Sequence, residues 1–114
     1  PAGDPMDAGR ALLPRLVGGT DPPRACAMAN DHLACGVLLA AQAAGVAVPG
    51  HIAVMGFGDF PIARQLTPAL TTMAPPRYEI GRQAARRVIA EIRDDRPARG
   101  GLALPCPLIE RDST

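Results

Sequence analysis

The stretch that decides the fold runs from Ile52 to Arg77 and reads IAVMGFGDFPIARQLTPALTTMAPPR. Its first four residues are continuously apolar, which is the pattern of a strand buried on both faces of a parallel sheet. Gly56 and Gly58 follow and allow a sharp turn, so Asp59 comes at the carboxyl end of this strand. Open α/β sheets bind ligands at the carboxyl ends of their strands. The stretch therefore predicts an α/β fold with a binding edge near Asp59.

The flanking segments predict that the sheet is parallel. Residues 70–73 form a second short apolar run, which ends at Pro75 and Pro76 because proline cannot donate to a β ladder. Upstream, Ala25–Met28 is a further apolar run, and it is followed at once by a helical pattern over residues 30–44. A strand, a helix and a strand of these lengths are typical of a right-handed parallel crossover.

Other elements follow from the same kinds of pattern. A helix over Asp7–Val17 is predicted, with Pro14 expected to shorten or kink it. Further elements are a short helix at Pro61–Leu66, a long helix at Tyr78–Arg93 and terminal strands at Leu102–Leu104 and Leu108–Ile109. The apolar stripe of the first helix, which predicts its buried face, consists of Ala8, Ala11, Leu12 and Leu16, and that of the long helix, whose partner lobe is expected to be missing here, consists of Ile80, Ala84, Val88 and Ile92.

The composition excludes several classes of protein. A chain of 114 residues forms one domain at most, and its formal net charge of +1 gives no electrostatic attraction to nucleic acid or to an anionic membrane. No apolar run approaches the roughly 20 residues of a membrane span. Cys26, Cys35 and Cys106 lack metal-ligand spacing, and so do His32 and His51. We therefore expect buried thiols, no metal and no cofactor.

Three segments carry a resemblance to a known family. They are GFGD at Gly56–Asp59, ARQLTPALTT at Ala63–Thr72 and PPRYEIGRQAA at Pro75–Ala85. Together they resemble the effector-binding domain of the LacI-type bacterial transcriptional repressors. The GFGD and PPR variants resemble the gluconate-repressor subgroup of that family. The resemblance continues through Arg24–Gly45 and Leu108–Thr114, and thus covers most of the chain.

The resemblance implies a periplasmic-binding-protein-like fold of type I, an α/β architecture with a parallel sheet flanked by helices. In that family two lobes enclose an effector cleft. Residues 1–74 would belong to the second lobe, residues 75–104 would supply a helix and a strand of the first lobe, and residues 105–114 would return to the second. The chain would then be the C-terminal fragment of the sensing domain of a cytoplasmic regulator, without its N-terminal helix-turn-helix.

Two groups of residues have both a structural and a functional interpretation. Asn30 and Asp31 follow a strand and start a helix, so they can be helix caps. Amide and carboxylate groups at a strand end can also bind sugar hydroxyls, and the resemblance places this pair in the effector cleft. Arg77 is either a solvated charge or an anion site at a helix start. The resemblance makes Arg77 face the cleft, where repressors of neutral sugars often have an apolar or aromatic residue.

Asp59 is the remaining candidate ligand residue. In many members of the resembled family two acidic residues follow the aromatic residue of this turn, and the first is the usual sugar-hydroxyl ligand. Gly58 stands at that first position here. Either Gly58 makes room for a different ligand, or Asp59 has only a structural role in the turn.

The resulting prediction is a sensor of a sugar acid such as gluconate. Arg77 adds a positive charge to the expected cleft, and Gly58 removes a negative one. Effector binding would shift the lobes and so alter operator binding by a homodimer. The resemblance predicts that the dimer contact comprises Ile62, Ala63, Gln65 and Leu66, with the exposed side of the helix over residues 31–44.

Two other functions remain open at this level. A periplasmic sugar-binding protein that feeds a transporter shares the fold, so the fold alone does not distinguish it from a regulator. A small α/β enzyme is the third class. No serine nucleophile elbow, P-loop or dinucleotide glycine motif in the sequence supports an enzyme.

Overall fold

The structure is a computed structural model that describes residues 3–94 and 100–114. The chain divides into two compact units. The first unit extends to Ala74 and is completed by Pro107–Thr114, and the second is Pro75–Cys106. These divisions fall near the predicted lobe boundaries, but the assignment of each unit to a lobe stays a prediction.

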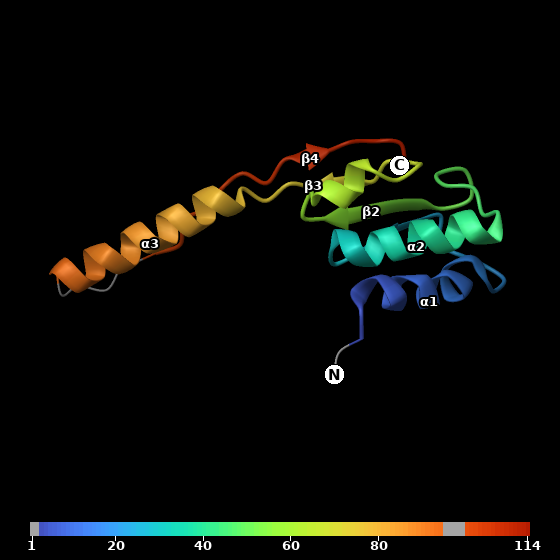
Figure 1. Cartoon of the computed structure of the whole chain (residues 1–114), viewed down its shortest axis with the longest axis horizontal. Helices are drawn as coiled ribbons and strands as arrows, with labels where there is room; N and C mark the ends of the chain where they lie inside the picture. Colours follow the sequence, from blue (N-terminus) through green and yellow to red (C-terminus); the bar gives the residue numbers. More distant parts are fainter. Residues whose placement is uncertain (1–2, 95–99) are drawn as a thin grey trace. The chain divides into compact units, whose positions relative to one another are not determined.

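The first unit is built on a sheet of four strands in the order β1-β2-β3-β4 (Figure 1). The strands are β1 (Ala25–Ala27), β2 (Ala53–Phe57), β3 (Thr71–Met73) and β4 (Leu108–Ile109). The first three are parallel, as predicted, and β4 is antiparallel to β3. Ala27 pairs with Met55, and Phe57 pairs with Met73, so the parallel strands end along one edge.

Helix α2 (Asp31–Ala44) packs against β2, and helix α1 (Pro5–Val17) packs on α2 (Figure 1). Asn30 caps the start of α2, and Gly45, with a φ of 68°, ends it in the left-handed conformation. The two helices are in close contact at two glycines. A Cβ at Gly9 would clash with the carbonyl oxygen of Leu33, and a Cβ at Gly36 would clash with the carbonyl oxygen of Met6. Glycine at these positions therefore permits the helix contact.

The predicted buried face of α1 is wrong in part. Ala8 and Ala11 are exposed, whereas Gly9 and Leu13 are buried. The reason is that α1 contacts α2 through Gly9, which turns a neighbouring face of the helix inward. Pro14 does not end the helix, which continues to Val17.

The core of the first unit lies between the sheet and the two helices. Helix α2 is buried over much of its surface because it is covered by the sheet on one side and by α1 on the other. The 3₁₀ helix η1 (Pro61–Arg64) also contacts α2 and contributes Ala63 to the core. The buried cluster comprises Leu13, Ala34, Cys35, Val37, Leu38, Ala41, Val54, Ala63 and Leu70.

The second unit contains helix α3 (Arg77–Asp94) and residues 100–106. Several apolar side chains of this unit are exposed: Ile80, Val88, Ile89, Ile92 and Leu102. The predicted strand at Leu102–Leu104 is not formed. A strand requires a ladder partner, and the described residues of this unit contain no other strand. No helix in the described part of the chain combines the length and apolar character that crossing a membrane requires.

Candidate functional site

Asp31 lies at the centre of a polar network at the carboxyl edge of the sheet. Its side chain is fully buried, and its Oδ1 accepts a hydrogen bond of 2.5 Å from the hydroxyl of Thr72. Its Oδ2 accepts a hydrogen bond of 2.8 Å from the backbone N–H of Phe60. The carboxylate thus joins the start of α2 to β3 and to the turn after β2. Both oxygens have a donor, as burial of a charged group requires.

The close approach of Asp31 to β2 requires Gly56. A Cβ at Gly56 would lie 3.0 Å from Cδ2 of Leu70 and 3.2 Å from Cα of Asp31, and it would clash with Oδ1 of Asp31. Gly56 therefore gives the carboxylate its position over the strand. Sequence reasoning assigned Gly56 to a turn, whereas the structure places it within β2.

The turn after β2 has an unusual backbone conformation at two successive residues. Gly58 has a φ of 135° and Asp59 has a φ of 46°. Aspartate tolerates the left-handed region better than most residues, but the φ of Gly58 strongly favours glycine. Two hydrogen bonds attach the turn to β3: Gly58 N–H to Met73 O at 2.8 Å, and Asp59 N–H to Thr72 Oγ1 at 3.4 Å.

The space beside Gly58 is occupied by the ring of Phe60. A Cβ at Gly58 would lie 2.6 Å from Cε2 and 2.8 Å from Cδ2 of that ring. The same ring contacts the imidazole of His32, with 5.0 Å between the ring centroids and a tilt of 47°. His32 lies in the first turn of α2 with its ring against Phe60.

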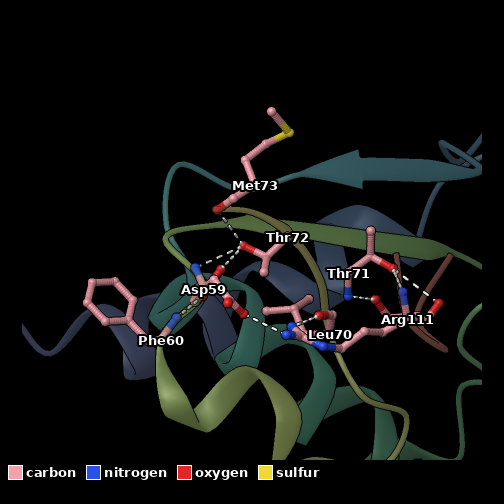
Figure 2. A network of polar contacts seen from close by, with 9 residues as sticks. Asp59, Phe60, Leu70, Thr71, Thr72, Met73 and Arg111 are labelled. Carbon is pink, nitrogen blue, oxygen red and sulfur yellow. Dashed lines mark hydrogen bonds and ion pairs between the residues drawn. The ribbon is translucent and has the colours of Figure 1, made fainter. Parts of the chain in front are cut away.

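Arg111 connects the C-terminal segment to this turn (Figure 2). One guanidinium nitrogen is 2.6 Å from Oδ1 of Asp59, and another donates to the carbonyl oxygen of Leu70 at 2.8 Å. The backbone N–H of Arg111 donates to Thr71 Oγ1 at 2.9 Å. Sequence reasoning did not identify Arg111 as part of the site, because 52 residues separate it from Asp59 and no local pattern marks the contact.

Ser113 fixes the same segment to the sheet at a buried position. Its hydroxyl donates to the carbonyl oxygen of Val54 at 2.6 Å and accepts from the N–H of Thr71 at 2.9 Å. Its backbone N–H donates to the carbonyl oxygen of Ala69 at 3.0 Å. The C-terminal segment is therefore attached to both β2 and β3 by bonds that do not involve the side chain of Arg111.

The structure brings three of the four predicted ligand residues together. Asn30 caps α2 by accepting from Leu33 N–H at 2.9 Å, while Asp31 binds Phe60 N–H beside Asp59. The start of α2 and the turn that carries Asp59 therefore lie at the same edge of the sheet. Asp31, however, is fully buried and presents no surface to a ligand. Arg77 belongs to the second unit, where it is an exposed residue at the start of α3.

The predicted dimer residues differ in the surface that they offer. Ile62 and Leu66 are half-buried and Gln65 is exposed. Ala63 is completely buried in the core, and its carbonyl accepts a hydrogen bond of 2.7 Å from Leu70 N–H. Ala63 therefore supports the fold and presents no surface to a partner.

The charge of Asp59 at this edge has a countercharge within the first unit. The guanidinium of Arg111 compensates the carboxylate of Asp59, and that ion pair is largely shielded, with 17% and 26% of the two side chains exposed. Burial raises the pKa of the Cys35 thiol to about 11, and the nearby Asp31 carboxylate contributes to the rise. Among the residues that the structure describes, no group of three His, Cys, Asp or Glu side chains is arranged to hold a metal ion.

Comparison with known proteins identifies the class to which this fold and site belong. Residues 2–114 match the family described as periplasmic binding protein-like domain. The HTH-type transcriptional repressor CytR of Escherichia coli K12 is 33% identical over 109 residues, which are 96% of this chain and 32% of CytR. The HTH-type transcriptional regulator GntR of Pseudomonas aeruginosa is 41% identical over 85 residues, which are 75% of this chain and 25% of GntR. The chain thus spans about a third or less of these relatives.

Comparison with a solved structure points to the same family of regulators. The LacI family transcriptional regulator of Arthrobacter sp. FB24, determined in complex with lactose, matches with a TM-score of 0.75 and 28% identity. The match covers 96% of this chain and 40% of that protein. The chain belongs to the periplasmic binding protein-like domain family, among the effector-binding domains of LacI-type transcriptional regulators.

Proposed function

We propose that the chain is the C-terminal part of the sensing domain of a transcriptional regulator that responds to a sugar acid such as gluconate. The observation that carries this proposal is the ion pair of Asp59 with Arg111, at 2.6 Å. Because the Asp59 carboxylate is paired with Arg111 and the Asp31 carboxylate is fully buried with a donor at each oxygen, the edge repels an anionic ligand less than two unpaired, exposed carboxylates would.

Asn30 and Asp59 are the residues of the first unit that we assign to ligand binding, since both retain exposed surface at the edge. Arg77 is the proposed partner of the ligand carboxylate, on the basis of the family resemblance. A charge-assisted hydrogen bond from arginine contributes about 1.5–3 kcal/mol. Asp31 is assigned to support these residues from within the fold, because both of its oxygens are engaged there.

The regulator would act by binding and without turnover, as a homodimer that reads operator DNA through a helix-turn-helix and therefore works in the cytoplasm. Ile62, Gln65 and Leu66 are the proposed dimer contacts. CytR and GntR are named as transcriptional regulators, which favours this function over an enzyme and over a periplasmic binding protein of a transporter.

Calorimetry on the full-length regulator tests the proposed ligand. Gluconate is expected to bind more tightly than glucose, and Arg77→Ala is expected to weaken gluconate binding about tenfold to a hundredfold. Arg82→Ala is the matched control, because Arg82 lies in the same helix and pairs with Glu79 at 2.7 Å. Tighter binding of glucose, or equal gluconate affinity in wild type and Arg77→Ala, would overturn the assignment.

A further inference from the structure

Arg111 reaches from the end of the chain to the turn that carries Asp59. We propose that Arg111 is a positioning residue of the ligand site, which holds the Asp59 carboxylate in place and supplies its countercharge. The inference rests on the proposed function and adds to it a residue that does not itself touch the ligand.

The geometry of the guanidinium supports this role. Its nitrogens donate to Asp59 Oδ1 at 2.6 Å and to the carbonyl oxygen of Leu70 at 2.8 Å. Because the guanidinium is planar and rigid, these two bonds fix the carboxylate of Asp59 relative to the start of β3. The side chain of Arg111 is only 17% exposed, so solvent weakens the pair less than it would at an open surface.

The backbone conformation of the turn makes an additional bond to Asp59 important. Gly58 and Asp59 both have a positive φ, and the N–H of Asp59 is 3.4 Å from its acceptor, Thr72 Oγ1, which is a long hydrogen bond. The bond from the carboxylate of Asp59 to Arg111 is much shorter. The backbone on either side of Asp59 is held by the bonds from Gly58 N–H to Met73 O and from Phe60 N–H to Asp31, and the carboxylate itself is held by Arg111.

A purely structural role for the guanidinium is less consistent with the contacts. The segment after β4 is already attached through the hydroxyl of Ser113, which bonds to Val54 and Thr71, and through the backbone N–H of Arg111. The side chain of Arg111 extends beyond these attachments to the turn at the carboxyl edge (Figure 2). Its distinctive contact is the one with Asp59.

The test compares two variants of the full-length regulator by calorimetry with gluconate and by thermal unfolding. Arg111→Gln removes the ion pair with Asp59 and is expected to weaken gluconate binding about tenfold or more. Thr71→Val removes the acceptor of the Arg111 backbone N–H but retains the guanidinium. This control is expected to lower the Tm while it leaves the Kd within about twofold of wild type, an interval small beside the tenfold effect.

A conservative variant tests whether ligand affinity can be restored, and other outcomes would overturn the proposal. Arg111→Lys keeps the positive charge but lacks the planar guanidinium that donates to two acceptors at once. This variant is expected to bind gluconate more tightly than Arg111→Gln and less tightly than wild type. The proposal is overturned if Arg111→Gln and Thr71→Val lose affinity alike, in proportion to their loss of Tm. If the wild-type regulator binds neither gluconate nor glucose, the proposed function fails by itself. Amide hydrogen exchange then decides the positioning role: the Asp59 and Phe60 amides must exchange faster in Arg111→Gln than in Thr71→Val.

Discussion

The hydroxyl of Thr72 and the carboxylate of Asp31 form a buried hydrogen bond of 2.5 Å, although 41 residues separate them in the chain. Thr72 lies in β3, whereas Asp31 is the first residue of α2. The bond therefore joins the start of α2 to β3 at the edge where the ligand is proposed to bind. Because Asp59 N–H is directed to the same hydroxyl, the bond also orients the turn after β2.

We expect the replacement of Asp31 to destabilise the first unit strongly. Asp31→Ala removes the acceptor of the Phe60 N–H and leaves the Thr72 hydroxyl only the longer bond to Met73 O at 3.3 Å, so the free energy of unfolding should fall by about 2–3 kcal/mol. Asp31→Asn keeps one acceptor oxygen and should cost less. Urea unfolding measures both, with Asp21→Asn as the control at an exposed acidic residue. Equal stability of Asp31→Ala and the control would refute the role given to this carboxylate.

The contact between α1 and α2 gives a second prediction. Gly36→Ala places a Cβ against the backbone of α1, where it would lie 3.0 Å from Arg10 N and Gly9 Cα and would clash with Met6 O. The helices must separate, so we expect a loss of about 1–3 kcal/mol in the free energy of unfolding.

Gly81→Ala is the matched control, because a Cβ at that helical position has no neighbour within 4 Å. This substitution should instead stabilise α3 by about 0.5–1 kcal/mol, through its higher helix propensity. An unchanged or raised stability of Gly36→Ala would show that Gly36 is not a packing glycine.

The parallel strands and the edge at which they end were predictable from sequence, because they depend on local features. The run that begins at Ile52 and the N-cap residue Asn30 are visible within a few residues of the chain, and the structure places both as expected. The short strand β4 was also placed correctly. Local hydrophobic periodicity was thus sufficient to predict most of the helices and strands of the first unit.

Contacts between residues that are far apart in the sequence were not predictable from these local features. The contact of Gly9 with α2 decided which face of α1 is buried, and no apolar spacing within α1 shows that contact. The ion pair of Arg111 with Asp59 joins residues 52 positions apart. At Leu102–Leu104 the apolar composition was correct for a strand, but a strand also depends on a partner outside the segment.

The thiol of Cys35 should give the protein a pH dependence at alkaline pH. Its pKa is raised from 9.0 to about 11 by burial and by the charge of Asp31. Because the folded pKa is above the unfolded one, the stabilising effect is complete below pH 9 and is lost as the pH rises toward 11. A rise of this size corresponds to about 2–3 kcal/mol.

Chemical unfolding at several pH values between 8 and 11 measures this loss. In Cys35→Ala the part of the pH dependence due to the thiol should disappear. Folded wild-type protein should also leave Cys35 unmodified by iodoacetamide at pH 8, because the thiolate is the reactive form and the side chain is fully buried. Identical alkaline profiles for wild type and Cys35→Ala would contradict the prediction.

The final prediction concerns the two residues that flank Asp59. Gly58→Ala should destabilise the protein for two separable reasons: a φ of 135° is unfavourable for alanine, and the new Cβ would overlap the ring of Phe60. Together they should cost about 2–4 kcal/mol of the free energy of unfolding. Phe60→Ala removes the ring and hence the second reason, but it leaves the backbone conformation of the turn to oppose the substitution.

A double-mutant cycle separates the two contributions. The cost of Gly58→Ala should be smaller in the Phe60→Ala background than in wild type, by about 1 kcal/mol or more, since steric coupling between contacting residues has this magnitude. Gly19→Ala is a useful control, because Gly19 also has a positive φ, of 91°, but a Cβ there has no neighbour within 4 Å. Its cost should be independent of Phe60. Additivity of Gly58→Ala and Phe60→Ala would mean that the ring does not restrict the side chain at position 58.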